Sequence, residues 1–266
     1  MGNIIFNNLK GQKVSFLFWA LGIVALVVLY IAFYPSIKES AAALQAYIDK
    51  MPEALRTAFV GSGTDYVTPV GYLTSEVFTF MTPLLFIVFA LIAGSGAVAG
   101  EEEKGTLDIL LSNPISRWQI LVEKFVAMCL SVTILAAILA LTLIIGSPTV
   151  DLDVSPQRIL DMVISVELLA LAFGSVSLFL GAATGIRAVS IGITGALMVV
   201  SFLVNALAPV VDFLKDLQKF SPFFHYIGDN PLLVGLQGGH VLVLLGITIL
   251  CLSLSVIAFE RRDLRI

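Results

Sequence analysis

Six long apolar stretches run through this chain, and they constrain its fold more than any other feature of the sequence. The hydrocarbon core of a bilayer is about 30 Å thick, so a helix that crosses it needs roughly 20 mostly apolar residues. The stretches lie approximately at residues 14–34, 76–100, 124–146, 159–185, 189–211 and 240–259. None of them alternates apolar and polar residues as the strands of an outer-membrane barrel do. The sequence therefore predicts an all-α membrane protein with six transmembrane helices.

The composition agrees with a chain whose main solvent is lipid. Of the 266 residues, 58 % are hydrophobic and only 13 % are charged, whereas a soluble domain carries about 25 % charged residues. The mean hydropathy is +1.01. We interpret residues 1–266 as a single transmembrane domain, with membrane lipid as a partner and no nucleic-acid partner.

Basic residues indicate the orientation of the six predicted spans. An even number of spans places both termini on one side, and short loops rich in Lys and Arg stay in the cytoplasm. With both termini in the cytoplasm, nine of the 15 basic residues lie inside and six outside. The inside set is Lys10, Lys13, Lys104, Arg117, Lys124, Arg187, Arg261, Arg262 and Arg265. We therefore expect cytoplasmic termini, an outer loop at residues 35–75 and a cytoplasmic loop at residues 100–124.

The cytoplasmic loop at residues 100–124 predicts a short amphipathic helix, a turn and a second helix start. Thr106 is a residue type that caps helices, and the leucines that follow it recur on one helical face. Pro114 ends this helix, because the residue before a proline avoids the α region. Ser116 and Gln119 have the spacing of a capping box, which starts the next helix. The leucines of the apolar face are Leu107, Leu110 and Leu111.

Three consecutive glutamates, Glu101, Glu102 and Glu103, precede this short helix. They follow the C-terminal end of the second span, where the helix dipole is already negative. In one interpretation, Gly100 and Gly105 break the helix and the acids face water. In the other, the acids meet basic residues of a soluble partner. The residues themselves leave both interpretations open.

At this loop the chain resembles the type-2 family of ABC (ATP-binding cassette) transporter permeases. The family segment has acidic residues, a Gly-Thr-Leu core, a Leu-Leu pair, a Pro, a Ser-Arg pair and a Lys. The corresponding residues here are Glu101 to Glu103, Gly105-Thr106-Leu107, Leu110-Leu111, Pro114, Ser116-Arg117 and Lys124. Further family-like segments are Ser221-Pro222-Phe223, Pro231-Leu232 and the tail from Arg261 to Leu264.

The resemblance implies a function and a set of partners. It implies a permease subunit of an exporter in the plasma membrane, which forms the transport path as a dimer with a second copy or a paralogue. Two separate cytoplasmic ATPase subunits would bind ATP, so this chain would be no enzyme and would hold no cofactor. The helix at about residues 106–113 would be the coupling helix, and Glu101, Glu102, Glu103 and Arg117 would form or flank its docking contact.

No phosphate-binding loop is recognisable in the sequence, which agrees with the expectation that ATP binds elsewhere. Such a loop needs a Lys after its second glycine and backbone amides that cradle phosphate. Residues 100–106 (GEEEKGT) share the two-glycine spacing, but they lack that Lys and place three acids where phosphate would sit. ATP is therefore expected on a partner chain.

Glu167 and Asn205 stand out among the polar residues inside the predicted spans. Glu167 is the only ionisable residue well within one, and acids at such depth serve function or pair with a polar neighbour. Counted at about 1.5 Å per residue, Glu167 and Asn205 lie at similar depths, roughly 12 and 9 Å below the outer face. We expect that these two side chains can form a hydrogen bond, with a dimer interface or the substrate path as alternative roles for Glu167.

Other functions fit the sequence less well. An intramembrane serine protease would need Ser95 and His240 to meet, but they lie near opposite ends of their spans. An ion-coupled carrier or a channel remains the alternative, although one glutamate is few for a carrier and neither explains the loop at residues 100–124. His225 and His240 are the only histidines, and a metal site usually needs three or four ligands; no metal site is predicted.

Overall fold

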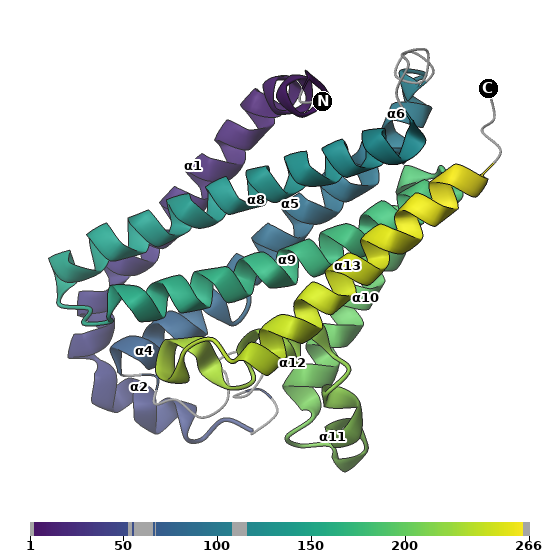
Figure 1. Cartoon of the computed structure of the whole chain (residues 1–266). Coiled ribbons are helices and arrows are strands. Elements are labelled where there is room, and N and C mark those ends of the chain that lie inside the picture. The colour runs from purple at the N-terminus through teal and green to yellow at the C-terminus, as the bar shows by residue number, and fades with distance from the viewer. Residues whose placement is uncertain (1–2, 53–54, 56–65, 67, 108–115, 263–266) are drawn as a thin grey trace.

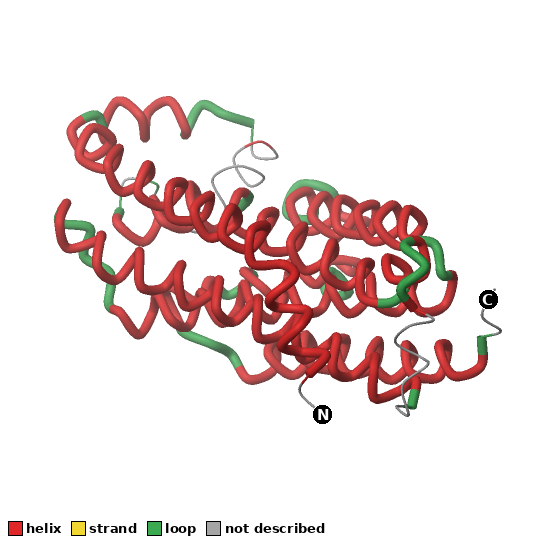
Figure 2. Tube along the Cα trace, turned by 90° about the horizontal axis from the view of Figure 1, so that it is seen from above, coloured by secondary structure: helices red, strands yellow, loops and turns green. Residues whose placement is uncertain are grey.

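The computed structural model describes residues 3–52, 55, 66, 68–107 and 116–262. These residues form an elongated helical bundle and contain no strand (Figures 1 and 2). Within them, six stretches are long and apolar enough to cross a membrane, as predicted. They are Lys13–Glu39, Pro69–Ala97, Arg117–Val150, Pro156–Thr184, Arg187–Leu207 and Gly238–Arg261.

The bundle is built from long helices joined by short helical segments. The long helices are α1 (Asn3–Glu39), α5 (Met81–Ala97), α8 (Arg117–Gly146), α9 (Pro156–Thr184), α10 (Arg187–Leu207) and α13 (Gly238–Arg261). The short segments are α2 (Ala41–Ile48), α4 (Pro69–Tyr72), the π-helix η1 (Leu73–Phe78), α6 (Ala99–Glu103), the 3₁₀ turn η2 (Ser147–Val150), α11 (Asp212–Gln218), α12 (Pro222–Ile227) and the π-helix η3 (Asn230–Val234).

Both ends of the predicted outer loop at residues 35–75 are helical in the structure. Helix α1 continues through Pro35 to Glu39, and the second span already begins at Pro69. This span is interrupted between η1 and α5. Pro83 has no N–H to bond the carbonyl of Thr79, and its ring crowds that carbonyl. The helix is therefore broken at Thr79 and Phe80, one turn before the proline.

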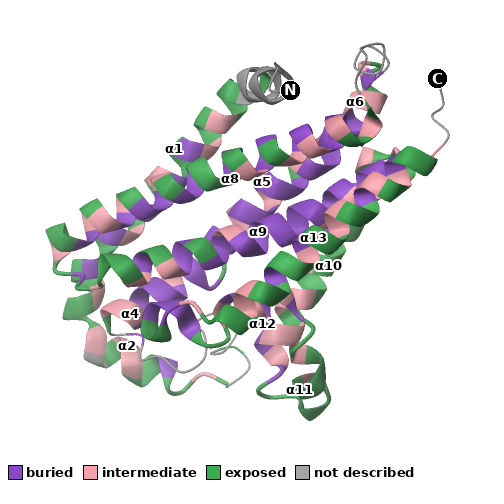
Figure 3. Cartoon of the chain, in the orientation of Figure 1, coloured by how far each residue is buried: buried purple, intermediate pink, exposed green. Residues whose placement is uncertain are grey.

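Helix α9 is the centre of the bundle. The spans differ in how much of their most apolar 18-residue window is buried in the bundle. The share is 61 % in the second span, which contains α5, and 67 % in the fourth span, which is α9. It is only 17 % for α1 and α13 and 11 % for α10 (Figure 3). The close approach of α5 and α9 depends on glycines. A Cβ on Gly94 would lie 2.3 Å from the carbonyl oxygen of Gly174. The outer helices α1, α10 and α13 pack around this pair and leave apolar faces exposed.

The two ends of the bundle differ in what they carry. The N-terminus of α1, α6, the start of α8 and the end of α13 lie at one end, which we call the termini end (Figure 1). The end of α9 and the start of α10 lie there too, because Ala182 of α9 bonds to Arg262 after α13 and Arg187 of α10 bonds to Glu103 of α6. Segments α2, α4, α11 and α12 lie at the other end, the distal end.

Candidate functional site

The candidate site is the termini end around the three glutamates. Helix α5 ends at Ala97, and the distorted backbone of Val98 (φ −119°, ψ −61°) separates it from α6, on which Glu101, Glu102 and Glu103 lie. Gly105 then takes a left-handed conformation (φ +66°) that favours glycine. The chain turns sharply here, so the three carboxylates reach helices that follow much later in the sequence.

Glu101 bonds to α8. Its Oε1 lies 2.5 Å from Nζ of Lys124, whose side chain is only 7 % exposed, and its Oε2 accepts a 2.5 Å hydrogen bond from the Thr106 hydroxyl. Burial raises the pKa of the Glu101 carboxyl, but the hydrogen bonds from Lys124 and Thr106 and the nearby lysine charges outweigh it. The pKa is therefore held below its ordinary value, and the charged pair persists.

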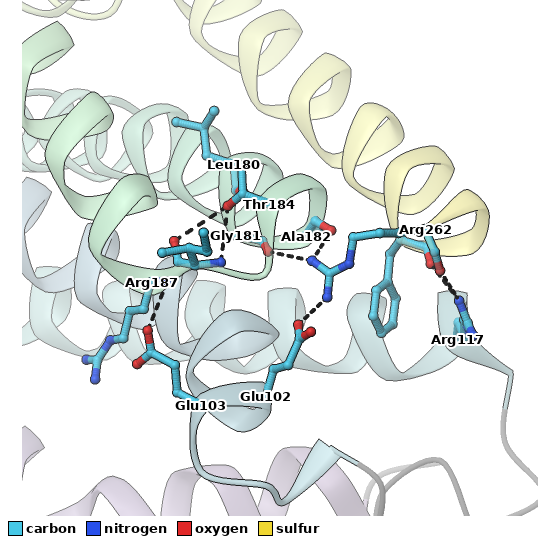
Figure 4. Close-up of polar contacts among 11 residues, drawn as sticks. Glu102, Glu103, Arg117, Leu180, Gly181, Ala182, Thr184, Arg187 and Arg262 are labelled. Carbon is cyan, nitrogen blue, oxygen red and sulfur yellow. Dashed lines mark hydrogen bonds and ion pairs between the residues drawn. The ribbon is translucent and has the colours of Figure 1, made fainter. Parts of the chain in front are cut away.

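Glu102 bonds to the last residue of the described chain. Its carboxylate forms an ion pair with Arg262, and both side chains are largely buried (Figure 4). The same guanidinium donates to the carbonyl of Ala182, 2.9 Å away at the end of α9. The last carbonyls of a helix lack partners within it and attract cations. Arg262 therefore joins α6, α9 and the end of α13.

Gly185 makes room for this ion pair. It caps α9 in a left-handed conformation (φ +69°), which L side chains rarely adopt. A Cβ on it would lie 2.7 Å from Oε2 of Glu102 and 2.8 Å from Nη1 of Arg262. Both its backbone conformation and the space above it thus depend on the absence of a side chain.

Glu103 caps the next helix. Its Oε1 accepts the backbone N–H of Arg187, the first residue of α10, at 3.1 Å (Figure 4). The first N–H groups of a helix are unpaired and form its positive end, so a carboxylate is stabilised there. The negative charge that is unfavourable after α5 is thus compensated by the start of α10.

Arg117, on the C-terminal side of the loop, bonds to the end of α13. Its Nη1 donates to the carbonyls of Phe259 (3.1 Å) and Arg262 (2.9 Å), and its guanidinium lies 5.8 Å from the centre of the Phe259 ring. The predicted capping box is confirmed, with the Ser116 N–H donating to Oε1 of Gln119 at 3.0 Å. The start of α8 is therefore fixed to the end of α13.

The predicted coupling helix falls mostly outside the described residues. Leu110, Leu111 and Pro114 lie there, and only Thr106 and Leu107 belong to the described chain. Leu107 is helical and 3 % exposed, and it packs with Leu121, Leu178 and Phe259 among others. The Thr106 hydroxyl donates to Glu101, so the described contact of this side chain is not a helix cap.

The structure therefore assigns the three glutamates and Arg117 partners within the chain. Both flanks of residues 108–115 are tied to α8, α9, α10 and α13. We call this set of ion pairs and helix caps, made by Glu101, Glu102, Glu103, Arg117, Lys124, Arg187 and Arg262, the bracing network. The partners of the glutamates could not be identified from the residue pattern, although basic residues at helix ends on the predicted cytoplasmic side were a signal for them.

The predicted hydrogen bond between Glu167 and Asn205 is wrong. Glu167 accepts a 2.5 Å hydrogen bond from the Thr133 hydroxyl of α8. Asn205 instead accepts from Nε2 of Gln218, 3.1 Å away in α11. Similar depth in the membrane does not fix the direction in which each side chain leaves its helix. The two residues face different neighbours.

The geometry also separates the serine and histidine of the protease alternative. Ser95 lies near the termini end of α5 and donates to the carbonyl of Ile92 at 3.1 Å. His240 lies in the first turn of α13 at the distal end and contacts His225 and Asp229. The two side chains cannot share a proton.

Comparison with known proteins agrees with this architecture. A family model described as "ABC-2 family transporter protein" matches residues 14–264, which is nearly the whole chain and includes all six spans. A search of curated protein sequences gave no significant match. The chain therefore belongs to the ABC-2 transporter family, as a multi-pass plasma-membrane permease and thus the membrane component of an ABC transporter rather than its ATPase.

Proposed function

We propose that the chain is the permease subunit of an ATP-driven exporter, which works as a dimer and is moved by two separate cytoplasmic ATPase subunits at its termini end. The observation that carries this proposal is the bracing network. It holds both flanks of residues 108–115 and connects them to four long helices. A displacement of this loop by a partner would therefore move several spans together.

The described contacts support transmission of force rather than simple docking. Glu102 and Arg262 connect α6 to the ends of α9 and α13, and Arg117 connects the start of α8 to the same end of α13. Ion pairs and charge-assisted hydrogen bonds of this kind are stronger than neutral ones. The glutamates are already used within the chain, so we expect the contact with the ATPase to fall mainly on residues 108–115.

The charges of the termini end support a cytoplasmic location. Lys124, Arg117, Arg187 and Arg262 all lie there, in keeping with the excess of basic residues in cytoplasmic loops. A partner that binds and hydrolyses ATP must reach the permease from that side. The ATP itself would be bound by the partner, because residues 100–106 lack the lysine of a phosphate-binding loop.

Exposed apolar surface supports a second copy. A groove with a volume of about 700 Å³ opens between α1 and α5, lined by apolar side chains such as Phe18, Trp19 and Leu85. Helix α10, on which only Ser190, Thr194 and Ala206 are buried, presents most of its length outward. In the proposed dimer, such faces would border the transport path.

Co-purification from native membranes tests the proposal and separates docking from transmission. Leu110→Asp places a charge on the apolar face of the predicted coupling helix, so we expect the ATPase subunit to be lost from the complex. Arg262→Gln breaks the bracing network, so we expect the ATPase to remain bound while transport-linked ATP hydrolysis falls about tenfold. Arg261→Gln is the matched control, since Arg261 is exposed and adjacent.

The outcomes are distinct. Loss of the ATPase in Leu110→Asp with intact protein supports docking at residues 108–115. Equal hydrolysis in Arg262→Gln and Arg261→Gln would contradict transmission through the bracing network. If no ATPase co-purifies with the wild type in several mild detergents, the proposed coupling to separate ATPase subunits at the termini end fails.

A further inference from the structure

The two histidines of the chain meet at the distal end. His225 lies in α12 and His240 in the first turn of α13. Their Nδ1 atoms are 2.8 Å apart. The sequence contains no other histidine, and fifteen residues separate these two. The loop that contains Asp229 and η3 folds back and brings them together.

The outer nitrogen of each ring faces an atom that can only accept. Nε2 of His225 lies 2.8 Å from the carbonyl oxygen of Lys219. Nε2 of His240 lies 2.8 Å from Oδ2 of Asp229. A carbonyl has no proton to give, and neither has an ionised carboxylate. Both Nε2 atoms must therefore carry a proton and donate it outward.

This arrangement leaves the two Nδ1 atoms facing each other. In two neutral rings, each would present a lone pair to the other, and no hydrogen bond could form at 2.8 Å. One additional proton turns this contact into a normal N–H···N hydrogen bond. We propose that His225 and His240 together form a binding site for one proton, which clasps α12 to the first turn of α13.

The distance fits a proton better than a metal ion. Two ring nitrogens on a tetrahedral zinc lie roughly 3.3 Å apart, given Zn–N bonds of about 2.0–2.1 Å. The Nδ1 atoms here are closer, at 2.8 Å. The Phe224 ring lies 5.3 and 5.5 Å from the centres of the two imidazoles and packs edge-to-face on both. It covers the pair while leaving the hydrogen-bonding atoms free.

Charged and titratable groups around the pair come from each neighbouring element. Asp229, which follows α12, balances the shared positive charge. Arg158 and Asp161 of α9 lie beside Gly235, and their side chains are 3.7 Å apart, so their opposite charges offset each other. Tyr226 of α12 donates its hydroxyl proton to the carbonyl of Phe78. The backbone carbonyl of Lys219 accepts the hydrogen bond from His225, and Lys219 itself is exposed to solvent.

A second proton on the pair is opposed. Burial, together with the nearby charge of His240, lowers the pKa of His225, and the bond to the Lys219 carbonyl offsets this only in part. Two protonated Nδ1 atoms would also point N–H groups at each other. The clasp therefore holds a single proton within a pH window and opens on both sides of it.

The clasp joins an anchored segment to a helix that reaches the termini end. Segment α12–η3 is bonded to the second span and to α9, through Tyr226 to Phe78 (2.7 Å), Asn230 to Thr74 (3.0 Å) and Ser165 to the Tyr226 carbonyl (2.7 Å). Helix α13 begins at the clasp and ends at Arg261, next to Arg262 of the bracing network. Release of the proton frees the first turn of α13 from this segment, so the pH at the distal end controls its movement.

Nitrogen NMR of the full-length chain in lipid nanodiscs tests the site. The histidine is ¹⁵N-labelled in the ring only and the purification tag is free of histidine, so the four ring nitrogens are the only labelled positions. The buffer contains a metal chelator. In the closed clasp, we expect three protonated nitrogens, one unprotonated nitrogen and a coupling between the two Nδ1 atoms. Two rings that titrate independently between about pH 4 and 9, with no coupling, would overturn the proposal.

Two substitutions sharpen the test. Asp229→Asn removes the balancing charge, so the titration midpoint of the shared proton should fall by about one pH unit. Lys219→Gln is the control, because it removes a nearby positive charge and keeps the carbonyl, so the midpoint should not fall. An unchanged midpoint in Asp229→Asn, or an equal fall in both variants, would contradict the site.

Hydrogen exchange of residues 222–242 measures the clasp without relying on one variant. In the wild type, we expect the backbone amides of this segment to exchange most slowly in the pH range in which the clasp holds one proton. Exchange should become faster on both sides of that range, after correction for the intrinsic effect of pH on exchange. In His225→Gln and His240→Gln, the protection should no longer depend on pH. A pH dependence that survives in both variants would show that another group controls this segment.

Discussion

The termini end and the distal end of the bundle are held together by different chemistry. At the termini end, full charges bridge helices, as in the ion pairs of Glu101 with Lys124 and of Glu102 with Arg262. At the distal end, apart from the histidine clasp, neutral side chains bond buried backbone, as Tyr226 does with the Phe78 carbonyl. A charged contact responds to salt, pH and partners, whereas a neutral buried contact does not. The difference marks the termini end as the part that responds to salt and to partners, and the distal end as a more rigid cap in which the histidine clasp is the pH-dependent element.

Gly185→Ala should have the largest effect on this comparison. An alanine at this position would have to adopt a left-handed backbone conformation, and its Cβ would overlap the ion pair of Glu102 and Arg262. We expect a loss of about 3 kcal/mol in the free energy of unfolding, measured by denaturant titration in detergent. Gly192→Ala is the control, since its added Cβ would meet nothing within 4 Å beyond the local backbone of its own helix. Equal stability of the two variants would contradict the tight packing at Gly185.

Tyr226→Phe should have the next largest effect, at the distal end. The hydroxyl that it removes is fully buried and donates to the Phe78 carbonyl at 2.7 Å. A buried group left without its partner costs about 2 kcal/mol. Tyr47→Phe serves as the control, because Tyr47 is 65 % exposed. Thermal unfolding of the two variants should differ clearly, and identical melting would show that the distal cap does not need this bond.

Arg262→Gln distinguishes the two ends by its dependence on salt. At low ionic strength, we expect it to lower the free energy of unfolding by about 1 kcal/mol. In 1 M salt, where the screening length is only about 3 Å, the difference from the wild type should shrink to about half. The cost of Tyr226→Phe should stay constant over the same range. A salt-independent effect of Arg262→Gln would argue that packing, rather than charge, holds the termini end.

Glu101→Gln should have the smallest effect, visible as a weaker loss of stability in acid than the wild type shows. Because the pKa of Glu101 is lowered in the folded chain, its charge contributes stability that is fully present above its ordinary pKa. This contribution is lost as the pH falls from there through the lowered pKa of the folded chain. Between about pH 6 and 3, the wild type should lose up to about 1 kcal/mol more than the variant. Glu260→Gln, at an exposed position, should follow the wild type.

The sequence predicted the spans well because length and apolarity alone decide them. It predicted less of the packing. Glycines four residues apart, such as Gly96 and Gly100, are a common sequence sign of close helix contacts, but the tight crossing is between Gly94 and Gly174. These two glycines lie in different spans, and a spacing rule within one span cannot pair them. The π-helices η1 and η3 also have no signal in the apolar pattern.

The site was predicted in position but not in detail. The resemblance and the charge pattern located the loop and the three glutamates. They could not show that Glu102 meets Arg262, because this contact depends on the arrangement of α6, α9 and α13 in space. The same limit explains why Glu167 and Asn205 do not bond to each other. Their depths in the membrane could be counted from the sequence, but the directions of their side chains could not. The coupling helix itself remains a prediction.

The bracing network also has a consequence for how the protein is made. The bond between Arg117 and the Arg262 carbonyl joins residues 145 positions apart, and the ion pair of Glu102 and Arg262 joins residues 160 apart. At about 5–20 residues per second, a ribosome needs roughly 10–30 s to add that stretch. During this time, Glu102 and Arg117 wait at the membrane surface without Arg262. A chain that stops before its sixth span keeps these charges unsatisfied, and quality-control proteases can distinguish it from a finished one.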